Sequence, residues 1–141
     1  LSDIQCALGI SQLKKLDIFL KRRREIAKIY NNFFAKLDYI KIQKLGPNVL
    51  HAYHLYNIKF NFLKKKIKKN KIIKLFRDNN INLQTHYFPV HLQPYYKKNF
   101  KFKKNDFPES EKHYNCSFSL PIYFRLKNKD IKKITDIFKK I

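Results

Sequence analysis

The stretch that decides the fold is His54-Leu55-Tyr56-Asn57-Ile58-Lys59-Phe60-Asn61-Phe62. Apolar and mostly polar side chains alternate along it, and this alternation is typical of a half-buried β-strand. A long apolar stripe at helical spacing precedes the stretch, and a basic amphipathic segment from Lys64 to Asn79 follows it. Helices on both sides of a strand indicate a layered fold in which helices cover a small sheet.

The chain before the strand predicts one long helix. Ser2 and Gln5 have the spacing of a capping box at its start, and apolar residues recur at helical intervals as far as Leu37. A helix from about Asp3 to about Leu37 would be roughly 50 Å long, which is long for a chain of 141 residues. We therefore expect it either to pack against polypeptide outside this chain or to break once.

The remaining chain predicts short mixed elements. Asn79-Asn80 is expected to end the basic helix in left-handed geometry, and Leu83 to Tyr87 is a candidate for a short strand. The prolines predict irregular chain from Phe88 to Tyr96, and Lys97 to Asn105 is expected to be a basic loop.

Three further elements complete the expected order. They are a helix that opens at Phe107-Pro108-Glu109, a strand from Ser117 to Ile122, and a final helix capped by Asn128. The fold class is therefore α/β, in the form of an α+β small domain with one long N-terminal helix and a small sheet covered by helices. We divide the chain into a long connecting helix, residues 1–38, and a small domain, residues 39–141.

Composition excludes several classes of protein. Hydrophobic residues make up 44% and aromatic residues 16%, which excludes a disordered polycation. No apolar run reaches the roughly 18 residues that a membrane-spanning helix needs. The two cysteines, Cys6 and Cys116, lie too far apart in the sequence to form a disulfide framework, and we expect a reducing, cytoplasmic location.

The net charge of +22 raises the question of nucleic acid. Of the 32 basic residues, 27 are Lys and only 5 are Arg, and Arg is the better donor to phosphates and base edges. We therefore expect only nonspecific binding, and a small free-standing nucleic-acid-binding protein is the alternative function. Arg22-Arg23-Arg24 is expected to be a solvated helix face, the alternative being a contact with a partner subunit.

No spacing predicts a metal site. His51 and His54 are three residues apart, as are His113 and Cys116, but neither pair is part of a paired zinc-binding motif. With two glycines in the whole chain, no glycine-rich phosphate loop is expected either.

Five motifs follow one another along nearly the whole chain. They are Leu1-Ser2-Asp3-Ile4-Gln5-Cys6-Ala7-Leu8-Gly9-Ile10-Ser11-Gln12-Leu13-Lys14-Lys15-Leu16-Asp17, His54-Leu55-Tyr56, the run from Asn79 to Tyr96, Phe107-Pro108-Glu109-Ser110-Glu111, and Ser119-Leu120-Pro121-Ile122-Tyr123. In this order they resemble the C-terminal half of sugar-nucleotide aminotransferases of the DegT type, which are pyridoxal-phosphate enzymes of fold type I. The run from His86 to Tyr96 most resembles members that aminate a UDP-linked 4-keto-6-deoxy-N-acetyl sugar in pseudaminic acid synthesis.

The resemblance implies an enzyme that moves an amino group to the 4-keto carbon of a UDP-linked sugar, with glutamate as the expected donor. It also implies a homodimer with its sites at the interface. The family's larger domain supplies the Schiff-base lysine and most contacts to the cofactor phosphate, and no counterpart of that domain is present in this sequence. We therefore expect the chain alone to be inactive, with neither catalytic nor cofactor-binding residues of its own.

Four residues are the candidates for binding the sugar nucleotide: His86, Tyr87, His91 and Tyr95. His and Tyr side chains supply hydrogen bonds to a pyrophosphate-linked sugar, and tyrosine rings offer flat apolar faces to a sugar or to uracil. The resemblance implies that their segment lies beside the cofactor cleft. The open alternative is that these histidines and rings only stabilise the core.

Overall fold

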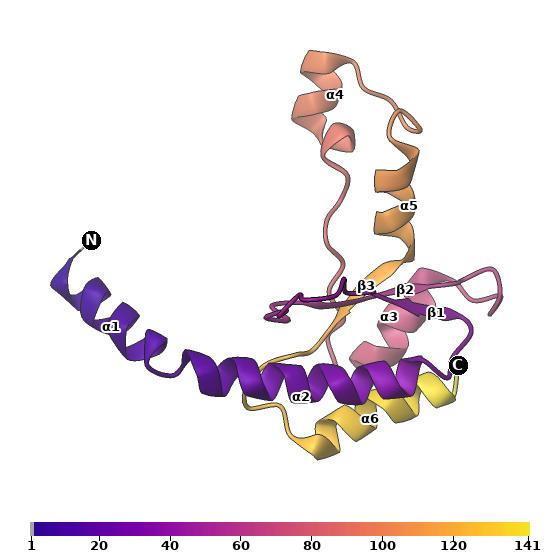
Figure 1. Ribbon diagram of the computed structural model, residues 1–141. Helices are drawn as coiled ribbons and strands as arrows, with labels where there is room; N and C mark the ends of the chain where they lie inside the picture. The colour runs from indigo at the N-terminus through magenta and orange to yellow at the C-terminus, as the bar shows by residue number, and fades with distance from the viewer. Residues whose placement is uncertain (1) are drawn as a thin grey trace.

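A three-stranded antiparallel sheet, ordered β1-β2-β3, lies at the centre of the computed structural model, which describes residues 2–141 (Figure 1). Strand β1 spans Ile40–Ile42, β2 Tyr56–Phe60 and β3 Ser117–Leu120. Strand β2 pairs with both neighbours, so that Ile58 lies opposite Ile42 and Phe118. The predicted strand around Ile58 is confirmed. Strand β1 was not predicted, because three residues are too few to show alternation. Leu1, where the first motif begins, lies outside the described residues.

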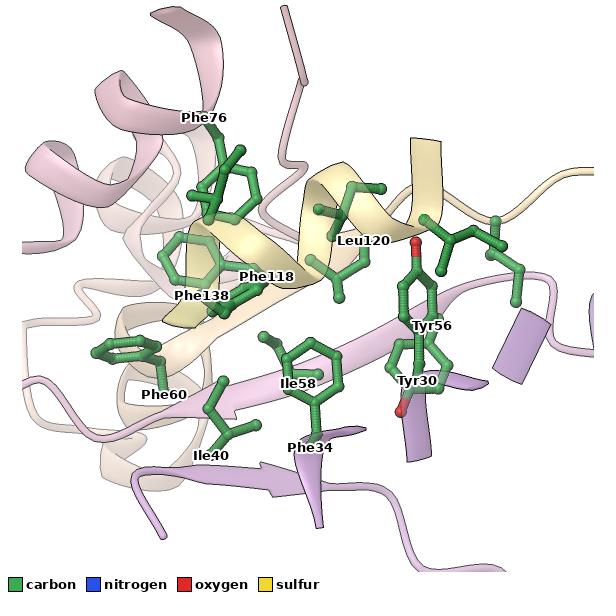
Figure 2. Close-up of a cluster of buried hydrophobic side chains, with 14 of the residues drawn as sticks. Tyr30, Phe34, Ile40, Tyr56, Ile58, Phe60, Phe76, Phe118, Leu120 and Phe138 are labelled. Atoms are coloured by element: carbon green, nitrogen blue, oxygen red, sulfur yellow. The ribbon is translucent and has the colours of Figure 1, made fainter. Parts of the chain in front are cut away.

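One face of this sheet is covered by helices. Alternate residues of β2 point to that face, and Tyr56, Ile58 and Phe60 are buried there. Figure 2 shows these side chains meeting Phe34 of the second helix and Phe138 of the last helix. The rings of Phe34 and Phe138 are 5.0 Å apart and perpendicular, a favourable edge-to-face contact. The core is therefore one layer between the sheet and the helices packed on it, and Phe76 also belongs to it.

The predicted long helix breaks once. It forms α1 (Asp3–Leu13) and α2 (Leu16–Phe34), separated by a turn at Lys14 and Lys15. The predicted capping box is confirmed: the Gln5 amide donates to Ser2 Oγ at 3.4 Å, and the Ser2 amide donates to Gln5 Oε1 at 2.9 Å.

The two helices differ in how they pack. None of the residues of α1 is buried, and Figure 1 shows this helix reaching away from the sheet. The C-terminal half of α2 is built into the core through Ile26, Ala27, Tyr30 and Phe34. The Tyr30 hydroxyl donates to the Pro121 carbonyl at 3.0 Å, which joins α2 to the chain after β3.

The basic helix after β2 is shorter than predicted. Helix α3 spans Lys69–Asp78, and residues 62–66 form turns instead. The Lys64 amide donates to Asn61 Oδ1 at 3.0 Å, a local bond that favours a turn over a helix. Asn80 has a φ of 59°, and the Ile81 amide donates to the Phe76 carbonyl at 2.9 Å. The predicted left-handed end of the helix is therefore confirmed.

Two predictions for the chain after α3 were wrong. The expected strand from Leu83 to Tyr87 is a single bridge, in which Gln84 and Ser119 exchange backbone hydrogen bonds of 3.1 and 2.7 Å before the chain leaves the sheet. The segment expected to be irregular and then a basic loop contains the 3-10 helix η1 (Val90–Leu92) and α4 (Pro94–Phe100). Pro94 stands in the first turn of α4, where its missing amide hydrogen costs nothing.

The last two helices follow the prediction closely. Helix α5 (Pro108–Cys116) starts at the predicted proline, and α6 (Asn128–Lys139) begins one residue after its true N-cap, which is Lys127 instead of Asn128. The Lys127 amide donates to the Asp130 carboxylate at 3.3 Å, so the side chain in the first turn caps this helix. The predicted fold class, a small sheet covered by helices, is confirmed. None of the described helices is long and apolar enough to cross a membrane.

Candidate functional site

The residues predicted to bind substrate lie on an arm, which we define as residues 86–107. Figure 1 shows the chain rising from the sheet through this arm to α4 and returning along α5, on the side opposite to α2 and α6. Phe88 packs edge-to-face against Tyr114 of α5, with their ring centres 5.6 Å apart. The arm is therefore held by α5 and not by the main core.

A buried polar contact joins the arm to α5. His91 and Glu111 are only 6% and 7% exposed, and His91 Nε2 lies 3.0 Å from Glu111 Oε1. The same carboxylate oxygen accepts a hydrogen bond from the Asn105 amide at 2.6 Å. The hydrogen bond from His91 and that from the Asn105 amide lower the pKa of Glu111 below its ordinary value of 4.5. The Glu111 carboxylate thus binds residues near both ends of the arm and holds them at α5.

This contact predicts a pH dependence. Because the pKa of Glu111 is lower in the folded chain, its stabilisation is present above pH 4.5 and is lost as the pH falls through the folded-state value. Between about pH 6 and about pH 3 we expect the Glu111→Gln variant to lose less free energy of unfolding than the natural chain. Urea unfolding at each pH measures this difference. The control is Glu109→Gln, on the same helix but exposed, which should behave like the natural chain.

Aromatic rings run in a continuous row along the arm. Successive ring centres are 4.9 to 5.8 Å apart, and the contacts run through Tyr95, Tyr96, Phe100, Phe102, Phe107 and His91. Phe100 and Phe102 stack with an angle of 13° between their planes. Tyr95 and Phe100 are nonetheless 65% and 57% exposed. The arm therefore presents flat apolar surface to whatever lies next to it.

The four candidate residues fall into different environments. Tyr87 is 75% exposed, and Tyr95 is also exposed at the start of α4. His86 packs against the Tyr87 ring with ring centres 4.6 Å apart, and both of its ring nitrogens are buried without a hydrogen-bond partner among the described residues. His91 is held by Glu111 inside the arm. The structure thus places all four on one arm and leaves the two tyrosines free to contact a ligand.

Several cavities of the described chain lie outside the arm. One of about 550 Å³ lies between the 80–84 segment, the end of β3 and the start of α6. Ser119, whose Oγ is buried without a partner in the described chain, Gln84 and Tyr123 contribute to its wall. In the sequence, the residues from Ser119 to Tyr123 stand out only as a family motif. Nothing in the spacing of these residues indicates that a cavity forms beside them.

The arginine cluster was wrongly expected to be a solvated face. Arg22 Nη2 donates to the Leu126 carbonyl at 2.7 Å, Arg23 Nη1 to the Tyr53 carbonyl at 2.8 Å, and Arg24 Nε to the His51 carbonyl at 3.1 Å. All three arginines are half-buried. They tie two loops to α2, because a guanidinium offers several donors in a fixed plane.

Similarity to known proteins identifies the family of this chain. The model of the DegT/DnrJ/EryC1/StrS aminotransferase family matches residues 1–139. The chain belongs to this family. Uncharacterized protein MJ1066 of Methanocaldococcus jannaschii is 42% identical over 141 residues, which are all of this chain and 36% of that protein. The UDP-4-amino-4,6-dideoxy-N-acetyl-beta-L-altrosamine transaminase of Campylobacter jejuni is 34% identical over 136 residues, 96% of this chain and 35% of that enzyme.

A solved relative extends the comparison to the fold. Spr1654 of Streptococcus pneumoniae, described as a sugar aminotransferase, superposes with a TM-score of 0.88 and 26% identity, over 99% of this chain and 35% of Spr1654. It has been solved in both its pyridoxal-phosphate (PLP) and its pyridoxamine-phosphate form. This aminotransferase-family chain therefore spans about a third of the length of the relatives that it matches.

The described residues do not form a complete site for PLP. A Schiff-base lysine needs a desolvated, accessible amine. Burial lowers the pKa of Lys69, but its ammonium lies over the rings of Tyr114 and Phe118, 4.5 and 5.3 Å from their centres, and donates to the Tyr114 carbonyl. Lys133, beside Asp130 in the wall of the 550 Å³ cavity, is exposed and donates to the Asn79 carbonyl at 2.7 Å.

Proposed function

We propose that this chain is the small-domain portion of a PLP-dependent sugar-nucleotide aminotransferase. The observation that carries the proposal is the family match over residues 1–139. The cofactor, when bound, supplies the electron sink for amino transfer. Because the described lysines offer no free desolvated amine, we assign the reactive lysine and most of the cofactor contacts to polypeptide outside this chain. The chain alone is then inactive, and the intact enzyme is a cytoplasmic homodimer.

The proposed substrate is a UDP-linked 4-keto-6-deoxy sugar, with glutamate as the amino donor. The similarity to the Campylobacter jejuni transaminase, at 34% identity, supports this choice. The product would enter a surface polysaccharide or a flagellin glycan. In this proposal residues 1–38 connect the missing large domain to the small domain, residues 39–141. The alternative of a free-standing nucleic-acid-binding protein has only the net charge of +22 in its favour.

The arm is the part of this chain that we assign to the sugar nucleotide. The exposed rings of Tyr87 and Tyr95 are available for packing against a sugar or a base. The unpaired ring nitrogens of His86 leave it able to accept or donate a hydrogen bond. His91, buried against Glu111, would position the arm instead of reaching the sugar itself.

Kinetics of the complete enzyme test this assignment. We expect Tyr87→Ala and Tyr95→Ala each to raise KM for the sugar nucleotide about threefold to tenfold, because each removes one aromatic contact. The KM for glutamate should stay unchanged. Tyr95→Phe keeps the ring and separates packing from hydrogen bonding. Leu50→Ala, which removes an exposed apolar side chain outside the arm, is the control. An unchanged KM for the sugar nucleotide in both alanine variants would remove the arm from the binding site.

A further inference from the structure

The face of the sheet turned away from α2 and α6 carries an unusual arrangement of charge. Since neighbouring residues of a strand point to opposite faces, Lys41 of β1 and Lys59 of β2 both project from this open face. The strand register places them directly opposite each other. Like charges in directly opposite positions of an antiparallel pair repel and destabilise the sheet.

Two cavities border this pair. Their volumes are about 610 and 810 Å³, and Lys41, Lys59 and His113 contribute to the walls of both. Lys44, Gln43 and Asn57 also line the larger one. We call these six residues the lysine face. The lining of the larger cavity includes no carboxylate, so that three lysines share one hollow.

The acidic residues nearby are already paired. The smaller cavity contains Asp38 and Glu109, but Asp38 is bound to Lys64 at 2.5 Å and Glu109 to Lys112 at 3.3 Å. Within residues 2–141 no carboxylate forms an ion pair with Lys41, Lys44 or Lys59. The charge of the lysine face is therefore not neutralised by the described chain.

The positive charge of the lysine face also acts on His113. Its pKa is lowered first by burial and then by the charges of Lys59 and Lys69. The imidazole Nε2 lies 3.4 Å from Asn57 Nδ2, at the border of both cavities. Positive charge therefore converges on one spot of the open sheet face.

We propose that the lysine face binds a small phosphoryl anion, and that a diphosphate group is its best-matched ligand. Lysine ammonium groups bind phosphate oxygens as point charges, and Lys41, Lys44 and Lys59 together match the charge of a diphosphate. An anion between Lys41 and Lys59 replaces their repulsion by attraction. The site lies on β1, β2 and α5, outside the arm, so it does not depend on the proposed amino transfer.

Calorimetric titration of the chain with inorganic pyrophosphate, at ionic strength held constant with sodium chloride, tests the proposal. We expect the double variant Lys41→Gln/Lys59→Gln to raise Kd at least about tenfold. The matched control, Lys97→Gln/Lys98→Gln, removes the same charge from exposed positions of α4 and should change Kd less than about twofold. Equal weakening in both variants, or no binding by the natural chain, would overturn the proposal, since attraction to a chain of +22 is then the whole effect.

Two further measurements keep the test decisive if the double variant folds poorly. Lys59→Arg keeps the charge and should bind pyrophosphate about as well as the natural chain. In the natural chain, proton NMR should show the pKa of His113 rising when pyrophosphate binds, because the anion offsets the field of Lys59. An unchanged pKa for His113 at saturating pyrophosphate would place the anion elsewhere and overturn the proposal.

A comparison of ligands distinguishes two sources of the diphosphate group, a free diphosphate and a nucleotide. Similar Kd values for pyrophosphate and for uridine diphosphate indicate a site for the diphosphate alone. Tighter binding of uridine diphosphate indicates a nucleotide as the source, and both results support the proposal. Uridine without phosphate should not bind, and binding of uridine as tight as that of uridine diphosphate would refute a phosphoryl site.

Discussion

The Phe138→Ala variant should lose about 3–5 kcal/mol of its free energy of unfolding. Phe138 is 0% exposed, and its ring contacts Phe34 of α2 and Phe76 of α3 at centre distances of 5.0 and 4.9 Å. Its carbonyl accepts the Tyr39 hydroxyl at 2.7 Å. Removing the ring leaves a cavity where three helices meet, and the surrounding residues can fill it only in part.

Urea unfolding followed by circular dichroism measures the loss. The comparison holds if the free energy of unfolding of both proteins falls equally steeply with urea concentration. The matched control is Phe100→Ala on the arm, since Phe100 is 57% exposed and its ring packs against Tyr96 and Phe102 of the arm. We expect it to cost less than about 1 kcal/mol. If the two variants lost the same free energy of unfolding, Phe138 would not be a core residue, and its contacts with Phe34 and Phe76 would be wrong.

The purified 141-residue chain is expected to show no amino transfer at all. A transaminase needs a desolvated, accessible lysine, and Lys69 already donates its amine to the Tyr114 carbonyl between two rings. Incubation with PLP, glutamate and a UDP-linked keto sugar should therefore release no 2-oxoglutarate. An enzymatic assay for 2-oxoglutarate measures this directly.

The full-length Campylobacter jejuni relative, assayed in parallel, shows that the substrates and the assay are sound. Steady turnover by the purified chain would contradict our assignment of the reactive lysine to other polypeptide. Comparing that turnover with the turnover of Lys69→Arg would then show whether Lys69 is the reactive residue. The pyrophosphate site is unaffected by either result, because its residues are on the lysine face.

The candidate site was only partly predictable. The order of His86, Tyr87, His91 and Tyr95 along the sequence placed them on one segment, and the structure does put them on one arm. Their exposure was not predictable, because Glu111, which buries His91, lies 20 residues away in sequence. The lysine face depends on the register between β1 and β2, which no local pattern reveals.

Local patterns determined the elements of this protein. The sequence alone predicts features that act over a few residues. They are the alternation around Ile58, the capping box at Ser2, the end of α3 at Asn80 and the start of α5 at Pro108. The tertiary structure alone decided which loops Arg22 to Arg24 bind and the opposition of Lys41 and Lys59. Each of these depends on groups distant in sequence meeting in space, and a periodic pattern carries no information about its partner.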